Sequence, residues 1–362
     1  MRMRVGILGA GAIGFGMAAF LAQGGHEPVL WSPSGRRTAT LAQGAALVAQ
    51  GEVQGDCVVD VAADCAQAVR DAQVVVLALP AYGHKAALEA AAPHLRADQT
   101  VIISSHLSLG ALYLSRLMAD RGAACPLIVA WGTTLLTASQ PGPSEVQVSS
   151  VRDRVDATTL PYARLDEGLA LCKALFGDRF AARDGLLAIA LSNLNPQNHL
   201  GIALLNLTRM ERAETWVQCQ NVTPAVGRII EALDAERLAI AAALGLRVKT
   251  VREHFSQSFH VPQADVSTMN QEMFLHGHRG QGPKTSESRY VLEDVPYGLV
   301  PMARLGRMAG CPAHLHEAGI ALISAAYGRD FTSANELLPA LGLSSQTSLA
   351  ALSTLAHTGY GH

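Results

Sequence analysis

A glycine-rich turn between a short apolar run and an apolar helix constrains this chain more than any other feature. Residues 5–8 read Val-Gly-Ile-Leu, and the pattern G-x-G-x-x-G follows directly with Gly9, Gly11 and Gly14. A further apolar run at 28–31 completes the order strand, turn, helix, strand, which is the βαβ unit in which this pattern binds a dinucleotide. The chain is therefore predicted to contain an N-terminal dinucleotide-binding domain of the doubly wound α/β class.

Each glycine of the pattern has its own task. Gly9 permits the tight turn, Gly11 lets the backbone approach a pyrophosphate without a Cβ, and Gly14 lets the helix pack on its strand. The N-terminus of that helix then faces the anion. The predicted contacts of the pyrophosphate and its neighbouring loop are Gly9, Gly11, Ala12, Ile13, Gly14 and Pro80.

The residues after the second predicted strand favour NADP over NAD. An acidic residue there would bond the ribose 2′-hydroxyl of NAD and repel a 2′-phosphate. The segment 31–37 contains no Asp or Glu and offers hydroxyls and guanidiniums, which suit a phosphate. These side chains belong to Ser32, Ser34, Arg36 and Arg37. NAD stays open, because two arginines also commonly begin an exposed helix.

Composition limits the class of partner. The chain has 362 residues, 49% of them hydrophobic and 16% charged, with a net charge of -2, which describes a globular protein of about two domains. No basic run points to nucleic acid or to an anionic membrane surface. Six cysteines lie scattered without a C-x-x-C pair, so neither a zinc site nor a disulfide framework is indicated. We expect small-molecule substrates and a cytoplasmic location, and a homodimer stays open.

The alternation of strands and helices continues to about residue 182 and then changes. Apolar runs at 73–80, 100–104 and 127–131 predict buried strands, and the polar segment 137–161 predicts hairpin-like edge structure. Beyond it, long segments with helical periodicity cover 185–192, 197–217, 224–244, 299–310 and 313–326. The predicted organisation is a Rossmann-type domain at 1–182 and an all-helical domain at 183–362.

Polar residues crowd the start of one helix in the second half. Asn195 is a good N-cap with Pro196 at the first helical position, which places His199 in the opening turn of an otherwise apolar helix. The helix dipole disfavours an imidazolium there, so an approaching carboxylate would suit His199 to acid–base chemistry. A capped helix with a satisfied buried histidine is the alternative.

A second polar cluster begins with Gly282-Pro283 and continues from Arg289 to Gly298. If its segment is extended, Glu293 and Asp294 point to opposite sides, and one of these carboxylates is expected to be solvated. A loop between domains, in which the aspartate caps a helix, is the alternative.

These motifs together resemble those of the octopine/nopaline-type opine dehydrogenases. The resemblance covers the whole chain and includes the glycine turn, Asn193 with Asn195-Pro196 and His199, and the block from Gly282 to Gly298. It implies a Rossmann domain joined to a helical domain like the C-terminal domain of 6-phosphogluconate dehydrogenase. It also implies that His199 is the catalytic histidine and that Asp294 orients it.

The resemblance implies a reaction as well. Opine dehydrogenases condense the amine of an amino acid with a 2-oxo acid, and the resulting imine takes a hydride from NADPH or NADH. The residues expected near the substrate are Asn193, Asn195, Thr133, Arg209 and Arg289, the arginines as clamps for carboxylates.

Two other functions stay open from the sequence. One is a reductase of a 2-oxo or 3-oxo acid that needs no amine, because Rossmann-plus-helical proteins of several families share this layout. The other is a non-catalytic dinucleotide-binding sensor. Two histidine pairs, 276/278 and 314/316, have the spacing of chelating residues but lack an evident third ligand, so no metal is expected.

Overall fold

The computed structural model describes residues 2–343 and 346–361, and these divide into two compact units. Unit 1 comprises Met1–Ala190 together with Ala340–His362, and unit 2 comprises Leu191–Pro339. The predicted domain boundary at 182/183 lies eight residues before the boundary between the two units. The return of the C-terminal segment to unit 1 was not predicted.

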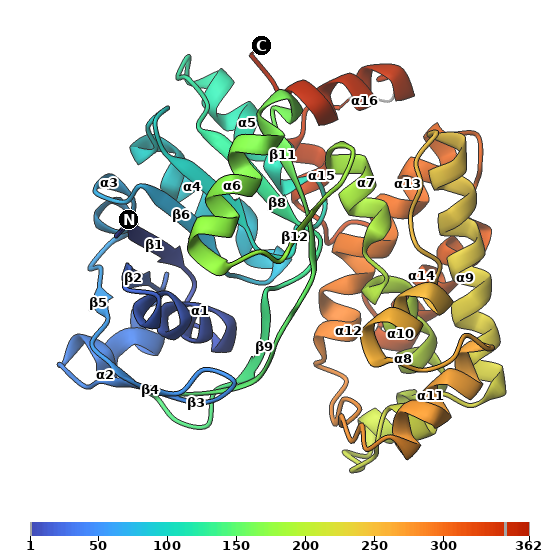
Figure 1. Ribbon diagram of the computed structural model, residues 1–362. Helices are drawn as coiled ribbons and strands as arrows, with labels where there is room; N and C mark the ends of the chain where they lie inside the picture. The colour runs from blue at the N-terminus through green and yellow to red at the C-terminus, as the bar shows by residue number, and fades with distance from the viewer. Residues whose placement is uncertain (1, 344–345, 362) are drawn as a thin grey trace. The chain divides into compact units, whose positions relative to one another are not determined.

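An eight-stranded sheet forms the centre of unit 1 (Figure 1). Its strands pair in parallel, except that β11 runs antiparallel to β8. In spatial order the strands are β12 (Phe180–Ala182), β11 (Val155–Leu160), β8 (Leu127–Trp131), β7 (Thr100–Ile103), β6 (Val74–Leu77), β1 (Arg4–Leu8), β2 (Glu27–Trp31) and β5 (Asp60–Val61). β6, β7 and β8 are buried at every residue, as near-continuous apolar runs in a parallel sheet require.

The strand order places a topological switch point between β1 and β6. From β1 the chain passes through helix α1 (Ala12–Gln23) to β2 on one side of the sheet, and it later returns to β6 on the other side. In open α/β sheets, ligands bind outside the carboxyl ends of the strands at such a point. The glycine turn follows the carboxyl end of β1, so the fold puts it at that place.

A second, four-stranded sheet covers α1. It joins two segments that are far apart in the sequence, drawn blue and green in Figure 1. Its strands, in spatial order, are β4 (Gly55–Cys57), β3 (Leu47–Gly51), β10 (Glu145–Val151) and β9 (Leu136–Ser139). The helix contacts β1 and β2 on one side and all four strands of the small sheet on the other, which explains why most of its residues are buried. The predicted hairpin within 137–161 is thus present as β9 and β10, but it belongs to this second sheet.

Helices cover the faces of the large sheet, and the C-terminal segment adds one more. The helices of unit 1 are α2 (Ala39–Ala42), α3 (Cys65–Arg70), α4 (His84–Ala91), α5 (Gly110–Asp120), α6 (Leu165–Phe176), α7 (Gly185–Ser192, whose last two residues belong to unit 2) and α16 (Leu349–Thr358). α15 (Leu337–Ala340) belongs to unit 2 except for its last residue. α16, red in Figure 1, packs against β11. Ser115 Oγ accepts a hydrogen bond from the backbone N–H of Tyr360 at 2.6 Å, which ties the C-terminal segment to α5.

Unit 2 is helical. Its remaining helices are α8 (Asn195–Glu211), α9 (Pro224–Ala243), α10 (Val251–Phe259), α11 (Val266–Leu275), α12 (Arg289–Leu292), a π-helical turn (Val295–Leu299), α13 (Val300–Met308) and α14 (His314–Tyr327). The predicted helices at 185–192, 224–244, 299–310 and 313–326 are confirmed within two residues. The helix predicted at 197–217 ends earlier, at Glu211, with a non-helical residue at Asn206. α10 and α11 were missed, because each is short and at least half of its residues are polar.

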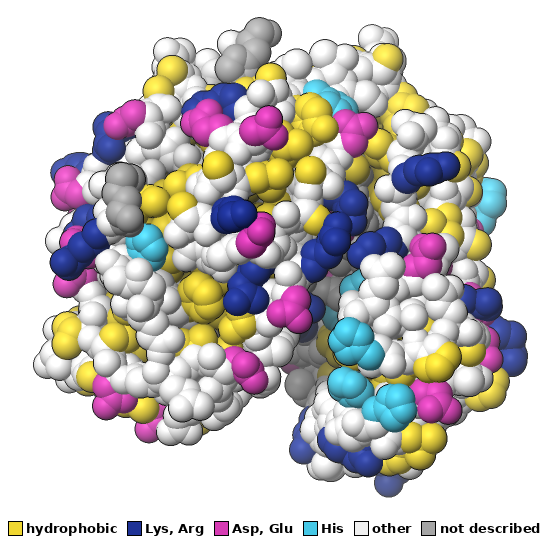
Figure 2. Space-filling view, in the orientation of Figure 1, with side chains coloured by type: hydrophobic (Ala, Val, Ile, Leu, Met, Phe, Trp, Pro, Cys, Tyr) yellow, Lys and Arg dark blue, Asp and Glu magenta, His cyan; other side chains and the backbone are white. Residues whose placement is uncertain are grey.

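Acidic and basic side chains are interspersed over the face shown in Figure 2, in keeping with the net charge of -2. Across residues 2–343 and 346–361, every helix is too short or too polar to span a lipid bilayer.

Candidate active site

The glycine turn has the geometry that a bound pyrophosphate needs. Gly9 has φ +128, and a Cβ on it would collide with the carbonyl of Ala78, at the carboxyl end of β6. A Cβ on Gly14 would collide with the carbonyl of Gly9, so this glycine lets α1 lie against the turn. At Gly11, in contrast, a Cβ would meet no atom within 4 Å. Packing within the protein therefore explains two of the three glycines, and the third keeps open a space that a ligand can enter.

The N-terminus of α1 lies at this space. Its N-cap residue is Gly11, in an extended conformation and without a capping side chain. The first backbone N–H groups, at Ala12 and Ile13, lack acceptors within the helix and can bond an anion. The turn thus fits the phosphates of a dinucleotide.

Two buried histidines bond backbone groups in unit 1, one in the neighbouring loop after β6 and the other in α5. His84 Nε2 donates a hydrogen bond to the carbonyl of Leu79 at 2.8 Å, beside Pro80, and His106 Nε2 accepts one from the backbone N–H of Ala111 at 3.2 Å, at the start of α5. Burial lowers the pKa of His84 to about 4 and that of His106 to about 3, so both rings are neutral at pH 7. Neither histidine belongs to a recognisable motif, so neither could be predicted from the sequence pattern.

The segment after β2 exposes the two predicted arginines. Ser32 is buried, and its carbonyl accepts the backbone N–H of Gly35 in a turn, whereas Ser34, Arg36 and Arg37 are exposed. One guanidinium N–H of Arg37 donates to Gln140 Oε1 at 3.3 Å. The turn therefore presents two guanidiniums and one exposed hydroxyl to solvent, within the range 31–37 that lacks an acid.

The start of α8 differs in detail from the prediction. Asn195 is the first helical residue and not the N-cap, which is Leu194. The side chain of Asn193 accepts a hydrogen bond from the backbone N–H of Asn195 at 3.0 Å. Asn193 therefore bonds a backbone N–H at the helix start, which is the task that was predicted for Asn195. The shift does not move His199 from the opening part of the helix, where it is buried.

His199 forms a pair with Asp294. Its Nδ1 lies 2.7 Å from Asp294 Oδ2, and the two residues are 8% and 1% exposed. A carboxylate only accepts, so Nδ1–H is the donor. The imidazole also lies flat on the ring of Tyr290, with centroids 3.6 Å apart and an interplanar angle of 9°. Residues separated by 95 positions are thus brought together at one buried point.

The segment that carries Asp294 is helical, so the expectation of an extended strand was wrong. α12 leads through Glu293 and Asp294, both in the right-handed helical region, into the π-helical turn. Neither carboxylate is solvated: Glu293 is 5% exposed, and its Oε2 lies 3.5 Å from Arg289 Nε. Adjacent residues of a helix project about 100° apart, which lets one carboxylate face Arg289 and the other His199.

A close contact between the two polar clusters keeps His199 and Asp294 together. A Cβ on Gly298, in the π-helical turn, would collide with the ring of Pro196 at the start of α8. Pro196 and His199 lie on α8, whereas Asp294 lies just before the π-helical turn. The contact between Pro196 and Gly298 therefore fixes the distance between the elements that carry the imidazole and the carboxylate.

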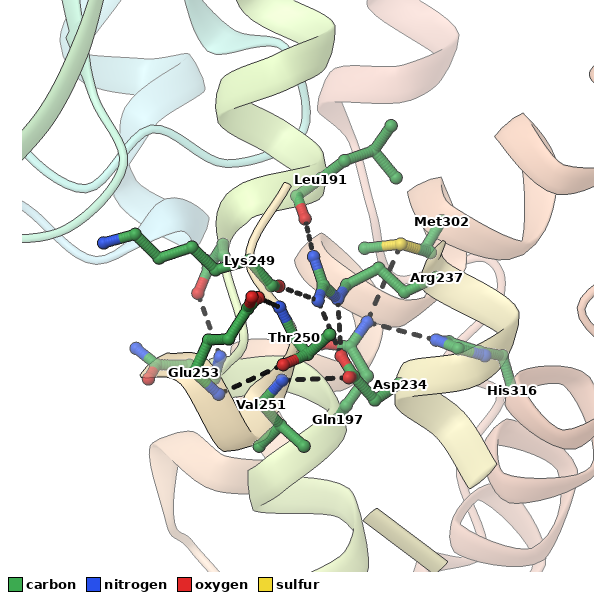
Figure 3. Close-up of polar contacts among 12 residues, drawn as sticks. Leu191, Gln197, Asp234, Arg237, Lys249, Thr250, Val251, Glu253, Met302 and His316 are labelled. Carbon is green, nitrogen blue, oxygen red and sulfur yellow. Dashed lines mark hydrogen bonds and ion pairs between the residues drawn. The ribbon is translucent and has the colours of Figure 1, made fainter. Parts of the chain in front are cut away.

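Buried polar contacts hold the surrounding helices (Figure 3). Asp234 accepts from the Arg237 guanidinium and from the backbone N–H of Val251, and Arg237 also donates to the carbonyls of Leu191 and Lys249. Burial lowers the pKa of Arg237, although Asp234 opposes this effect. This network joins the end of α7 and the start of α10 to α9.

A second pair of a histidine and a carboxylate connects α14 to α9. His316 Nδ1 lies 2.7 Å from Glu236 Oε2, and its Nε2 lies 3.1 Å from the amide nitrogen of Gln197, which is also near the sulfur of Met302 (Figure 3). The Glu236 carboxylate also accepts the backbone N–H groups of Leu315 and His316 at the start of α14. Burial alone would raise the pKa of Glu236, but these hydrogen bonds lower it below its usual value. Glu236 therefore acts as a cap for α14.

The structure separates the residues expected to bind substrate. Arg289 precedes the stacked Tyr290 and is 54% exposed at its side chain. Arg209 lies ten residues after His199 on α8, about 15 Å along the helix, and its guanidinium faces Glu214 at 3.7 Å. Thr133 belongs to unit 1, half-buried just after the carboxyl end of β8. Of the two arginines, Arg289 is the one that lies near the histidine.

The other histidine pairs do not form a chelating group. Among the described residues, no set of three His, Cys, Asp or Glu side chains is arranged to hold a metal ion. His316 is instead buried and bonded to Glu236, as described above.

Comparison with known proteins assigns both halves of the chain. Residues 182–327 match the family described as NAD/NADP octopine/nopaline dehydrogenase, alpha-helical domain. Residues 5–155 match the family described as ketopantoate reductase PanE/ApbA. The two matches correspond to the helical and the sheet-containing parts of the chain.

Similar proteins extend over nearly the whole chain. The opine dehydrogenase of Arthrobacter sp. (strain 1C) is 30% identical over 345 residues, which covers 94% of this chain and 95% of that protein. The solved structure of octopine dehydrogenase with NADH and L-arginine has a TM-score of 0.80 at 16% identity, covering 99% of this chain and 100% of that one. Yersinopine dehydrogenase with NADP+ bound has a TM-score of 0.71 at 16% identity, covering 99% and 98%.

Proposed function

This chain belongs to the opine dehydrogenase family, and from that premise we propose that His199 and Asp294 perform the acid–base step of its reaction. The chain is an NAD(P)-dependent dehydrogenase that acts on CH–NH bonds. The reaction condenses an amino acid with a 2-oxo acid and reduces the product to a secondary amine, or runs in reverse. The observation that carries the proposal is the 2.7 Å hydrogen bond between His199 Nδ1 and Asp294 Oδ2.

The cofactor-binding residues of the proposal are those of the glycine turn and of the turn after β2. The open space at Gly11 and the uncapped start of α1 would hold the pyrophosphate. When bound, the dinucleotide supplies or accepts a hydride. Because the segment 31–37 has no acid and exposes Arg36 and Arg37, we propose NADP as the preferred form.

His199 would exchange the proton at Nε2, because Nδ1 is already bonded to Asp294. In the condensation, the amine adds to the carbonyl carbon, and loss of water then leaves a C=N bond. During addition one amine proton moves to the carbonyl oxygen, and protonated Nε2 can donate the second proton with which this oxygen leaves as water. The nitrogen keeps its remaining proton, so the C=N bond that forms is an iminium, which accepts hydride to give the secondary amine. Asp294 would hold the ring in the tautomer that exposes Nε2 and would stabilise the imidazolium when it forms.

Arg289 would bind a substrate carboxylate. Both substrates carry a carboxylate next to the reacting atom, and a guanidinium can bind one in a bidentate manner. The buried Glu293 carboxylate, 3.5 Å from Arg289 Nε, orients the side chain from its other side. Asn193, Asn195 and Thr133 stay in the proposal as polar groups that are near the substrate.

The experiment that tests the proposal is a matrix of amino acids against 2-oxo acids with the purified protein. NADPH and NADH oxidation is followed by absorbance in each combination. We expect oxidation that requires both substrates and that is faster with NADPH. Oxidation with a 2-oxo acid alone would instead support a reductase that needs no amine, the function to which the match of residues 5–155 also points.

A further inference from the structure

We propose that Tyr290 is a positioning residue for His199, and that Gln218 in turn holds Tyr290. The inference rests on the proposed acid–base role of His199 and assigns a task to the Gly282-Pro283 motif, which that role leaves unexplained. Asp294 fixes one atom of the imidazole, whereas the ring of Tyr290 fixes its plane.

The imidazole needs a second constraint because a hydrogen bond to one ring atom leaves its plane undefined. The terminal torsion of a histidine side chain has a broad energy profile, so the rotamer does not define that plane either. Tyr290 covers one face of the imidazole at a centroid distance of 3.6 Å and an interplanar angle of 9°. With Nδ1 bonded to Asp294 and one face covered, the direction in which Nε2 points is determined.

The geometry of the stack is that of a cation over the face of a phenol ring. Two neutral aromatic rings prefer an offset or edge-to-face arrangement, with centroids about 4.5–7 Å apart, over a face-to-face one. A cation over the face of a phenol ring is attracted to it. A parallel arrangement at 3.6 Å therefore suits the state in which His199 carries the proton that it donates.

Tyr290 is itself held at its far end. Its hydroxyl donates a hydrogen bond to Gln218 Oε1, and burial raises the pKa of Tyr290 to about 12, so the donor is present throughout the working pH range. The phenol ring therefore has an anchor on one side and the imidazole on its face.

The anchor depends on the Gly282-Pro283 motif. The backbone N–H of Gln218 donates to the carbonyl of Gly280 at 2.9 Å, and that of Gly282 donates to the carbonyl of Trp216 at 2.9 Å. The indole N–H of Trp216 donates to the carbonyl of Pro283 at 3.1 Å. A Cβ on Gly282 would collide with the Trp216 ring, so only glycine permits this pairing. The motif thus places Gln218 where its amide meets Tyr290.

The test combines kinetics with the ¹H–¹³C NMR signals of the His199 ring in the full-length protein. H199Q identifies those signals by their loss. The ring current of Tyr290 places them upfield in the wild type, and we expect them to stay upfield in Y290F and to move downfield in Y290L. We expect kcat to fall about tenfold in Y290L and about threefold in Y290F, which keeps the ring but loses its hydrogen bond to Gln218, and we expect KM and dinucleotide Kd to be unchanged in both.

Two further variants make the test specific. Q218A should broaden the His199 signals and lower kcat by about threefold, because it releases the hydroxyl without removing the ring. Tyr327 is a matched control, since its hydroxyl donates to the carbonyl of Ser286 and its ring contacts Phe331, so Y327L should leave the His199 signals in place.

The proposal is overturned if Y290L keeps wild-type kcat and His199 signals, or if Y290F loses as much activity as Y290L. Should Y290L not fold, Y290F and Q218A decide, because unchanged kcat and signals in Q218A remove the role of Gln218. Failure of the proposed function is separate: it shows as absence of turnover in the wild type, whereas the NMR signals still report whether Tyr290 orients the ring.

Discussion

In unit 1 the buried rings of His84 and His106 bond to backbone groups, whereas in unit 2 those of His199 and His316 each bond a carboxylate at 2.7 Å. Among the described residues, Nδ1 of neither ring in unit 1 has a partner. A proton added there would place an uncompensated charge in the interior, which explains the low pKa values of about 4 and 3. A proton added to a ring in unit 2 meets a carboxylate.

Histidine side chains therefore have two different uses in this protein. In unit 1 the histidine is a neutral hydrogen-bonding group that holds a loop and a helix start. In unit 2 each of these two rings bonds a carboxylate, and of the two only His199 bonds a carboxylate whose neighbour, Glu293, pairs with an exposed arginine, Arg289. The pair of His316 and Glu236 differs from that of His199 and Asp294, because its carboxylate also accepts the backbone N–H groups at the start of α14.

The largest expected effect comes from breaking the pair of His199 and Asp294. H199Q and D294N should each lower kcat by about a thousandfold, because acid–base catalysis contributes about 10²–10⁴. The dinucleotide Kd, measured by fluorescence titration, should stay within about twofold, since the glycine turn is untouched. Wild-type turnover in either variant would remove that residue from the mechanism.

Acid should destabilise unit 1 through its buried histidines. Their folded pKa values lie below the ordinary 6.5, so the unfolded chain binds more protons as pH falls. Stability is complete above pH 6.5 and is lost toward the folded pKa values, by about 1.4 kcal/mol per pH unit for each histidine. At pH 5.5 this amounts to about 3 kcal/mol for the two.

Hydrogen exchange of the α5 amides at pH 7.5 and 5.5, corrected for intrinsic rates, measures this loss in unit 1. The α9 amides report unit 2 in the same sample. H106Q, which cannot take up the proton, should reduce the pH dependence of α5 by about half. Equal pH dependence in H106Q and the wild type would contradict the assignment.

Removal of the guanidiniums after β2 should affect cofactor choice alone. The double variant R36A/R37A should bind NADPH at least about tenfold more weakly, because charge-assisted bonds to the 2′-phosphate are lost. NADH binding and kcat at saturating cofactor should change by less than about twofold. An equal loss of affinity for both cofactors would show that the arginines do not read the 2′-phosphate.

The smallest expected effect concerns the second histidine–carboxylate pair of unit 2, His316 with Glu236. E236Q should lower the free energy of unfolding by about 1–2 kcal/mol, because it weakens the cap of α14, and should leave kcat near that of the wild type. Urea denaturation and the substrate matrix measure the two quantities. A fall in kcat as large as that of D294N would show that the second pair also serves the reaction.

The local sequence pattern was enough to predict the fold class and the glycine turn. One glycine of the turn depends on a contact between near neighbours: Gly14 faces the carbonyl of Gly9, five residues away. The buried strands are continuous apolar runs, and the main helices of unit 2 show their period directly. Such features are encoded within about 20 residues and can therefore be read without coordinates.

Tertiary contacts decided what local pattern could not. Glu293 and Asp294 were predicted to lie in an extended segment, but this segment is helical. Gly298 packs on Pro196, which is far away in the sequence, and this contact stabilises a helical turn there. The pairing of Asp294 with His199 was supplied by resemblance, since spacing alone left it open. The return of the C-terminal segment to unit 1 likewise follows from contacts such as that of Tyr360 with Ser115.

Short-range pattern along the chain was enough to specify a glycine turn on a doubly wound sheet, a helical second half and a histidine at the start of an apolar helix. The groups that surround that histidine come from long-range packing: the carboxylate on Nδ1, the tyrosine on its face and the glutamine bonded to that tyrosine. The physical reason is that periodicity and capping act over a few residues, whereas the protonation and orientation of a buried imidazole depend on partners about 20 to 95 positions away along the chain.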